Sequence, residues 1–315
     1  MLSGILYALA AGALWGFIFL ASMVLVDYSS ADIALGRFVV CGLISIILLL
    51  PRFSFLKRIM TWQLTLQALG LACLSYSFYF LALAEAIKLA GIVPATLVIG
   101  LLPITIPLLS HKNLTRPRVF YLSIALIVVG LGILNWPLIT GITLPDGNRE
   151  SWIKGLALAL AALCMWTFFA PLNARVLLKH PHMDSSTWSS LLGLFAMITI
   201  LPIWAVLTPD AGLPERLFES HYLLWMLLCG GGGSWLAGMC WNQASRRLPE
   251  ALAGQLIISE TIFSLIYGFI YGGRWPNAQE MMASALLVGG VVMGVRAFQG
   301  RVAIIVPQPE GPKAS

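Results

Sequence analysis

The chain has 315 residues, of which 59% are hydrophobic and 10% charged, and its formal net charge is +6. Average soluble domains carry about 25% charged residues, so a water-soluble fold could not bury this much apolar surface. The composition therefore excludes an ordinary soluble protein and indicates that lipid surrounds most of the chain. The positive charge does not indicate a nucleic-acid partner, because the basic residues stand in short loops between apolar runs.

Apolar runs of about 20 residues, each long enough to cross about 30 Å of hydrocarbon, recur along the whole chain. Continuous runs of this length predict transmembrane helices, not strands, so the fold class is an all-α integral membrane protein. The ten predicted spans are 4–26, 31–50, 62–84, 89–110, 117–137, 152–178, 184–207, 221–244, 249–272 and 278–297.

Basic residues are divided unequally between the two alternating sets of loops. Thirteen Lys and Arg residues lie near the ends of spans 2, 4, 6 and 8 and in the tail, whereas five lie in the other loops. Because positive charge favours the cytoplasm, both termini are expected there, and 298–315 is a predicted cytoplasmic tail.

An internal repeat relates the two halves of the sequence, 4–137 and 152–297. Each half contains five predicted spans, and an odd number makes the second copy enter the membrane from the opposite side. The matching segments are Gly4 and Ala10–Trp15 with Gly155 and Ala161–Trp166, Ala86–Lys88 with Ala244–Arg246, and Ala125–Gly130 with Ala285–Gly290. The sequence thus predicts two inverted five-helix repeats, an arrangement associated with alternating access.

Three stretches resemble the EamA repeat of the drug/metabolite transporter superfamily, and the resemblance covers nearly the whole chain. They are Ala13-Leu14-Trp15-Gly16, the turn 86–95 leading to Leu101-Leu102-Pro103, and the turn 244–253 leading to Ser259-Glu260-Thr261. The resemblance implies ten helices around a central cavity and the proton-linked or facilitated movement of amino acids, nucleosides, vitamins or drugs. Ser75-Tyr76 and Trp241-Asn242 are also similar to stretches in aromatic amino acid exporters.

Two charged residues lie inside predicted spans, Glu260 near the middle of the ninth and Arg37 in the second. A charge within the bilayer is costly unless it faces a cavity or a partner. Glu260 is either a site for a substrate amine or a proton, or a structural carboxyl hydrogen-bonded to a neighbouring helix. Arg37 either contacts a substrate carboxylate or extends outward to Asp27 or Asp32. Together the two charges would suit a zwitterion.

Aromatic residues at mid-span positions are the second candidate group, because Trp and Tyr usually prefer the membrane interface. Lining a wet cavity would explain their position, although packing in the core is the alternative for each. The substrate-binding candidates besides Glu260 and Arg37 are Trp15, Tyr76, Tyr79, Phe80, Trp166, Trp235, Trp241 and Asn242.

Backbone signals indicate kinks and close helix contacts. Pro94, Pro103 and Pro107 in the fourth span remove helical hydrogen bonds and are the candidate gating residues. Gly230 to Gly233 favour a close approach or a hinge, and Gly12-xxx-Gly16 and Gly290-xxx-Gly294 favour tight contacts, within the bundle or in a homodimer.

The combined features predict a secondary transporter of the inner membrane that exports amino acids or related zwitterions. An uptake carrier for a vitamin or nucleoside is the alternative, and protons are a candidate coupling ion. The sequence lacks the clustered carboxylates or histidines expected of a membrane-embedded enzyme, and it has no GxxxxGK[ST] motif for ATP. No catalytic residue, metal site or cofactor is therefore expected.

Overall fold

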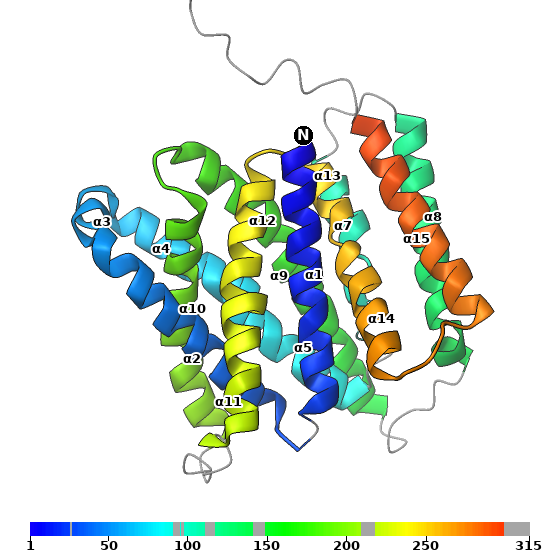
Figure 1. Cartoon of the computed structure of the whole chain (residues 1–315), viewed down its shortest axis with the longest axis horizontal. Coiled ribbons are helices and arrows are strands. Elements are labelled where there is room, and N and C mark those ends of the chain that lie inside the picture. The colour runs from blue at the N-terminus through cyan, green and yellow to red at the C-terminus, as the bar shows by residue number, and fades with distance from the viewer. Residues whose placement is uncertain are drawn as a thin grey trace, which may run out of the picture.

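The described part of a computed structural model comprises residues 1–25, 27–90, 95, 98–110, 117–140, 149–208 and 218–298, and within it the secondary structure is entirely helical (Figure 1). Eight helical segments are long and apolar enough to cross a membrane, and a shorter apolar stretch, Leu2–Ile18, precedes them. The fourth predicted span, 89–110, lies partly outside the described residues. Pro94 and nearly all of the predicted tail also lie outside them.

The helices follow the predicted spans in chain order. In the first half they are α1 (Leu2–Val24), α2 (Ser30–Leu49), η1 (Leu50–Arg52), α3 (Phe53–Ile59), α4 (Trp62–Ala72), η2 (Cys73–Ser77), α5 (Phe78–Ala90), α7 (Leu102–Ser110) and α8 (Pro117–Thr140). In the second half they are α9 (Arg149–Lys179), α10 (Ser185–Leu207), α11 (Ser220–Leu227), η5 (Leu228–Leu236), α12 (Ala237–Ser245), α13 (Glu250–Leu256), α14 (Ser259–Tyr271) and α15 (Ala278–Phe298).

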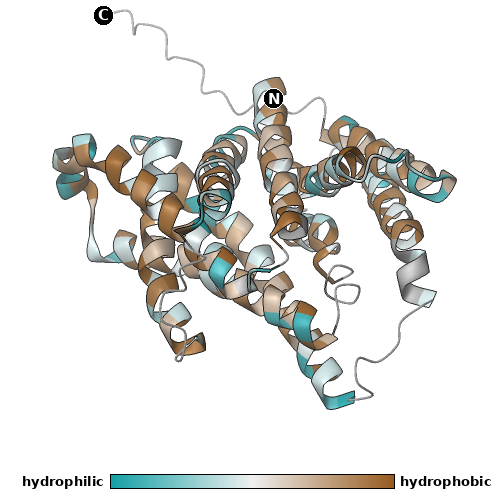
Figure 2. Ribbon diagram, turned by 60° about the horizontal axis from the view of Figure 1, so that its bottom comes forward, coloured by the Kyte–Doolittle hydropathy of each residue, from teal (hydrophilic) through white to brown (hydrophobic). Residues whose placement is uncertain are grey.

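The outer surfaces of the helices are apolar, as a lipid environment requires. Large side chains such as Ile47, Val206 and Ile270 are 65%, 78% and 73% exposed. Hydrophobic residues run along the helices, with hydrophilic ones more frequent near their ends (Figure 2).

Several of the basic loops come together at one end of the bundle, here called the basic end. Arg52, after α2, forms a 2.5 Å ion pair with Asp184, before α10. Arg246, after α12, donates to the carbonyl oxygen of Met183. The start of α8 and the end of α15 meet through the rings of Phe120 and Phe298, and the N-terminus lies at the same end (Figure 1).

The ninth predicted span differs from expectation because it is not one uninterrupted helix. A turn at Ile257 and Ile258 separates α13 from α14, and the Glu260 N–H donates to the carbonyl of Ile257 at 2.9 Å. A comparable turn at Gly100 and Leu101 precedes α7. Pro103 follows that turn and lacks an N–H, which favours a helix start there. The break at Ile257 and Ile258 is buried in protein, where a discontinuous membrane helix can be tolerated, whereas Leu101 at the other break is 40% exposed.

The third helix of each half contains a π-helical segment, η2 in the first half and η5 in the second. The run from Gly230 to Gly233 lies within η5 and lets neighbouring helices approach it closely. A Cβ added at Gly230 would lie 2.6 Å from the carbonyl oxygen of Arg37, and one at Gly233 would lie 2.7 Å from Ile18. The missing side chains therefore let η5 pack directly on α1 and α2.

Glycines that the sequence repeat matches make reciprocal contacts. A Cβ at Gly4 would lie 2.8 Å from the Leu248 side chain, whereas one at the matching Gly155 would lie 2.6 Å from the backbone nitrogen of Ala90, which matches Leu248. The two halves therefore pack on each other through glycine contacts at matching positions.

The α8–α15 pair shows the same reciprocity. A Cβ at Gly130 would lie 3.0 Å from Leu287, and one at the matching Gly290 would lie 2.7 Å from Ile127, which matches Leu287. Gly294 faces Gln255 of α13 within the same chain, so both predicted glycine pairs make contacts inside the bundle.

Candidate functional site

Three tryptophans from α1, α9 and α12 meet in the middle of the bundle. Trp15 contacts Trp166 with ring centroids 5.3 Å apart and planes at 88°, and Trp241 lies 5.6 Å from Trp15 and 5.8 Å from Trp166. Tyr79 and Phe169 extend this tryptophan cluster, at 6.0 and 5.1 Å from Trp166. The structure thus brings four of the predicted aromatic site residues together.

Close packing of α1 against α14 positions Trp15. A Cβ added at Gly12 would lie 2.0 Å from the Ser259 Oγ, and one at Gly16 would lie 2.9 Å from the Ser264 nitrogen. The two glycines therefore hold the backbones together and direct Trp15, one residue before Gly16, toward α9 and α12.

Arg37 lies in a pocket of aromatic and small polar groups between α2, α5 and η5. Its Nε donates to the Ser234 Oγ at 2.6 Å, and that hydroxyl donates to the Cys229 carbonyl at 3.1 Å. The guanidinium carbon lies 5.1 Å from the Phe38 ring centroid and 5.6 Å from that of Phe80. Rings at this distance attract a cation through their quadrupoles, which partly replaces the lost hydration.

Tyr76 joins this pocket through η2. Its ring lies 5.6 Å from that of Phe38, and its hydroxyl is 3.5 Å from the Ser234 carbonyl oxygen, which it faces as donor. Tyr76 and Ser234 are equivalent in the sequence repeat, so the two π-helical segments meet at matching positions. π-Bulges are frequent at functional sites, because the additional residue redirects the side chains around it.

Glu260 lies in the first turn of α14, directly after the break in the ninth span, and is half-buried. The N-terminus of a helix favours negative charge. Its backbone lies against Gly12 and Gly16, on either side of Trp15, and no direct ion pair joins Glu260 to Arg37 among the described residues. These residues thus place opposite charges near the tryptophan cluster without neutralising each other by contact.

Asp32, one of the two alternative partners predicted for Arg37, is otherwise engaged. The Asp32 Oδ1 accepts from Trp204 Nε1 at 3.2 Å, and its Oδ2 accepts from the Ser29 N–H at 3.4 Å. Arg37 instead turns toward η5, because Gly230 leaves room for the backbone of α2 there.

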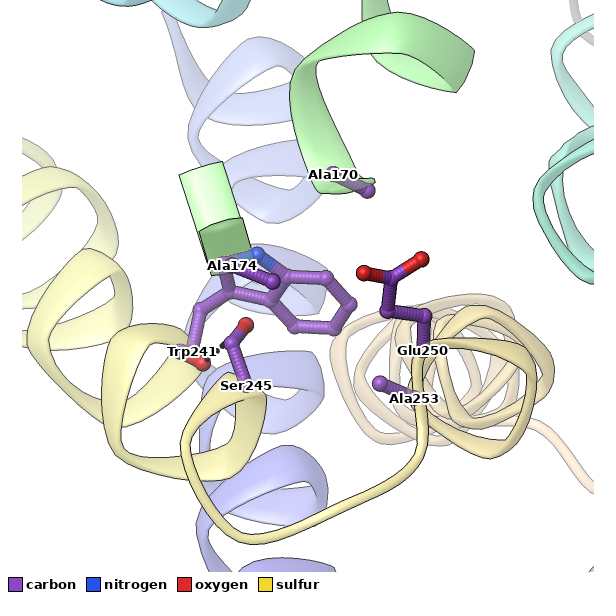
Figure 3. A pocket seen from close by; sticks show the side chains of 6 residues that line it. All are labelled: Ala170, Ala174, Trp241, Ser245, Glu250 and Ala253. Carbon is purple, nitrogen blue, oxygen red and sulfur yellow. Dashed lines mark hydrogen bonds between the residues drawn. The ribbon is translucent and has the colours of Figure 1, made fainter. Parts of the chain in front are cut away.

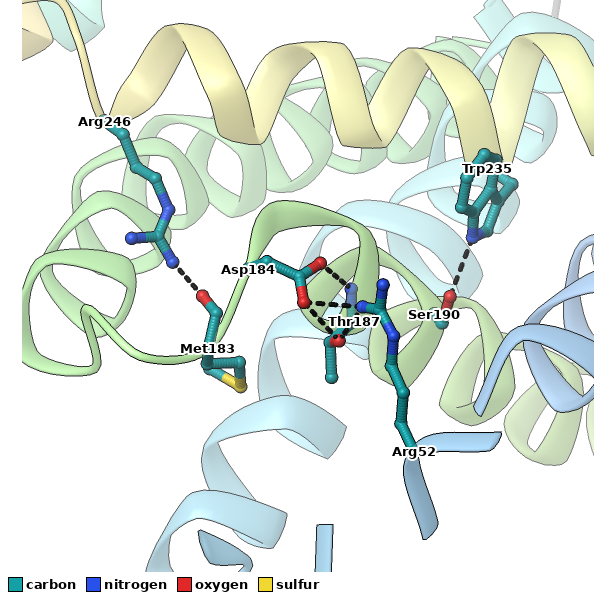
Figure 4. A network of polar contacts seen from close by, with 7 residues as sticks. All are labelled: Arg52, Met183, Asp184, Thr187, Ser190, Trp235 and Arg246. Carbon is teal, nitrogen blue, oxygen red and sulfur yellow. Dashed lines mark hydrogen bonds and ion pairs between the residues drawn. The ribbon is translucent and has the colours of Figure 1, made fainter. Parts of the chain in front are cut away.

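Asn242 and Trp235 are satisfied by the protein itself in this conformation. Asn242 Nδ2 donates to the Ser189 Oγ at 2.7 Å, and its Oδ1 accepts from Asn173 Nδ2 at 2.8 Å. Trp235 Nε1 donates to the Ser190 Oγ at 2.9 Å (Figure 4). Both side chains tie η5 and α12 to neighbouring helices.

The described gating candidates, Pro103 and Pro107, are buried in α7. A Cβ added at Gly254 of α13 would lie 3.1 Å from the Pro107 Cδ and 2.7 Å from Ile106. The two broken spans therefore pack on each other at Pro107, whereas Pro94 lies outside the described residues.

A small cavity adjoins the tryptophan cluster between α9, α12 and α13, with Trp241 and Glu250 on opposite walls (Figure 3). Its volume of about 10 Å³ is at the lower limit of what one water molecule needs. Trp241 is 3% exposed, and its Nε1 has no hydrogen-bond partner among the described residues. Trp241 thus borders both the cluster and this cavity.

Several of these residues were not predicted from the sequence. Ser234 could have been found from the repeat, because it matches Tyr76. Glu250 offered a weaker signal, an acid at the start of a span beside the basic pair Arg246 and Arg247. Phe38 and Phe169 gave none, since aromatic residues are frequent in all of these spans. Among the described residues, no group of three His, Cys, Asp or Glu side chains could hold a metal ion.

An acidic residue ties α2 to α10 at each end of this helix pair. At one end Asp32 of α2 accepts from Trp204 of α10, and at the other Asp184 accepts from Arg52 at 2.5 Å (Figure 4). Burial alone would raise the pKa of Asp184, but the hydrogen bonds from Arg52 and Thr187 outweigh it and hold the pKa below its ordinary value.

Comparisons with known proteins agree with this architecture. The sequence model of the EamA-like transporter family matches residues 2–136 and 153–296. The chain is 32% identical over 323 aligned residues to the inner membrane protein YtfF of Escherichia coli K12, covering 94% of this chain and 96% of that protein. A solved crystal structure, 21% identical, superposes with a TM-score of 0.74 and covers 94% of this chain and 97% of the other.

Proposed function

Because the chain belongs to the EamA-like transporter family, we propose that it is a secondary transporter of the inner membrane that exports amino acids or related zwitterionic compounds. The inner-membrane location is supported by the similarity to the inner membrane protein YtfF and by the apolar helices. The gathering of basic loops at the end that holds both α1's start and α15's end supports cytoplasmic termini.

The observation that carries the substrate class is the placement of Arg37 and Glu260 beside the tryptophan cluster. The Glu260 backbone lies against α1 beside Trp15, the Arg37 guanidinium lies 5.6 Å from the Phe80 ring centroid, and no direct ion pair joins the two charges. A zwitterion could offer its carboxylate to Arg37 and its ammonium group to Glu260, while Trp166 and Tyr79 pack against its side chain. Charged groups are costly within a membrane, so two of opposite sign beside one aromatic cluster fit a zwitterionic ligand better than a neutral one.

The transport mechanism we propose is alternating access by two inverted halves. Its support is the reciprocity of contacts at Gly4 and Gly155, and at Gly130 and Gly290. Two broken spans and two π-helical segments also occupy comparable positions in the halves. Matching contacts of similar energy would let the halves exchange roles around the central cluster. In this state the aromatic contacts close the centre of the bundle.

Transport in reconstituted vesicles tests the proposal directly. The purified chain in proteoliposomes should exchange labelled amino acids, and Arg37→Gln and Glu260→Gln should each reduce the initial rate about tenfold or more, as expected for the loss of roughly 1.4 kcal/mol of a charged hydrogen bond. Arg274→Gln is the matched control, because Arg274 pairs with Glu280 far along the chain from the cluster. Unchanged rates in both test variants, with folding intact, would eliminate the assigned substrate site.

Vesicle assays also test the direction of transport and the identity of the coupling ion. Everted membrane vesicles should accumulate substrate if the protein exports, whereas right-side-out vesicles should do so if it takes up nutrients. A proton ionophore should abolish accumulation above the external concentration if protons are coupled. Retained accumulation under the ionophore would overturn proton coupling.

A further inference from the structure

We propose that a groove on the lipid-facing side of α4 and α9 binds an anionic phospholipid from the leaflet at the basic end. The groove has a volume of about 370 Å³ and runs between the two helices, with walls formed mainly by Leu66, Leu71, Leu74, Leu172 and Val176. This volume lies within the range of small-molecule sites and can take the upper part of an acyl chain. The proposal concerns a site separate from the tryptophan cluster.

Glycine creates the space in the groove. A Cβ added at Gly70 would meet nothing within 4 Å, although Gly70 lies between helices that both face lipid. At Gly230, by contrast, a neighbouring helix occupies the space of the missing side chain, whereas Gly132 and Gly268 face open space as Gly70 does. What distinguishes Gly70 is that its open space belongs to the groove, whose apolar walls favour a hydrocarbon chain over a soluble ion.

Positive charge lines the groove toward the basic end. Arg175 and Lys179, four residues apart on α9, share one face of that helix, and both are exposed. Neither makes a hydrogen bond or ion pair with another described residue. Gln67, on α4, adds an amide to the same wall. A phosphate is the complementary group, since Arg and Lys both bind it through charge-assisted hydrogen bonds.

Along the groove, basic and apolar side chains follow one another in the same order as the headgroup and acyl chains of a phospholipid. Lys179 is the last residue of α9, and Leu172 lies seven residues before it, or about 10 Å deeper at about 1.5 Å per residue. The basic groups thus lie where a headgroup sits, and the leucines lie where acyl chains begin. Basic pockets between membrane helices at the cytoplasmic side are known to favour anionic lipid headgroups.

Lipid titration of the full-length protein tests the site. The melting temperature in a neutral detergent should rise with dioleoyl phosphatidylglycerol and rise much less with dioleoyl phosphatidylcholine, because a ligand of the folded state stabilises it. Arg175→Gln/Lys179→Gln should weaken phosphatidylglycerol binding about 30-fold, at roughly a factor of five for each basic residue. Gly70→Phe should weaken it while keeping the charge. Its side chain enters open space, so the ligand-free melting temperature should hold.

Matched controls separate this site from general charge attraction. Lys57→Gln/Arg58→Gln removes the same charge at the same end of the bundle but outside the groove, and should leave binding unchanged. Glycerophosphoglycerol and inorganic phosphate, which lack acyl chains, should not compete at equal concentration. Equal effects of the two lipids, equal losses in both double variants, full binding by Gly70→Phe, or competition by phosphate would each overturn the proposal.

Discussion

Trp15 and Trp166, which occupy matching positions in the two sequence halves, meet edge to face with centroids 5.3 Å apart. Residues related by a repeat touch each other only where the two copies meet. The contact therefore marks the meeting point of the halves, and Trp241 closes it on the third side. In the alternating-access mechanism proposed above, a substrate that passes between the halves would separate these rings.

This relationship predicts a transport defect in tryptophan variants. Trp166→Ala should lower the initial transport rate about tenfold or more, because it removes contacts to four rings, each worth roughly 0.5–1.5 kcal/mol beyond area burial. Trp166→Phe should retain more activity. Trp275, 91% exposed, provides the control Trp275→Ala. A rate for Trp166→Ala equal to that of this control would show that the cluster plays no part in transport.

Close packing of α8 against α15 predicts a strong effect of one methyl group. Gly290→Ala should lower the free energy of unfolding by about 1–3 kcal/mol, because the new Cβ would lie 2.9 Å from the Ser123 carbonyl oxygen, a backbone atom that cannot move alone. Gly132→Ala, also in this helix pair, meets nothing within 4 Å and should be neutral or stabilising. Thermal unfolding in detergent measures both. Similar melting temperatures for the two variants would contradict the reciprocal packing.

We expect Asn242 to stabilise the folded protein, because its amide joins α12 to α9 and α10. Asn242→Ala should cost about 1–3 kcal/mol, since it leaves the buried Asn173 Nδ2 and Ser189 Oγ without this partner. Gln243→Ala, at the neighbouring and less buried position, should change stability by less than about 0.5 kcal/mol. Denaturation of both variants beside the wild type provides the comparison. Unaltered stability together with weaker substrate binding would instead favour a direct role in the site.

The ion pair at the basic end predicts a pH dependence with a defined sign. The pKa of Asp184 is lower in the folded protein, so its charge stabilises the fold above the ordinary Asp pKa of about 3.9. That stabilisation is lost as the pH falls through the lowered folded value. Asp184→Asn should therefore reduce stability at pH 7, by less than about 1 kcal/mol because the side chain is half exposed.

The difference in stability between wild type and Asp184→Asn should shrink as the pH is lowered below about 4, because Asp184 becomes protonated and is then as uncharged as the Asn that replaces it. Asn keeps the cap on α10 through its side-chain oxygen, so the variant isolates the charge. Melting temperatures of both proteins from pH 3 to pH 7 measure this difference in stability. A difference that grew toward low pH would have the wrong sign for the Arg52 pairing.

The sequence by itself determined that the chain is a helical membrane protein with an internal repeat. Hydrophobic length and the positions of Lys and Arg follow directly from the energetics of the bilayer, which acts on each segment separately. The repeat matches at Gly4 and Gly155 could likewise be read from spacing alone. The family resemblance, carried by the same segments, was confirmed by the match over both halves.

Only the tertiary structure decided which polar and aromatic groups meet. The sequence left Arg37 between contact with a substrate carboxylate and extension outward to Asp27 or Asp32. In the structure its Nε donates to Ser234 of η5, a helix that approaches α2 closely at Gly230. The sequence also contained no sign that the ninth span breaks before Glu260, because Ile257 and Ile258 suit a continuous helix in lipid as well as a turn. Such choices depend on packing between segments far apart in the chain, whereas hydropathy and charge are properties of each segment alone.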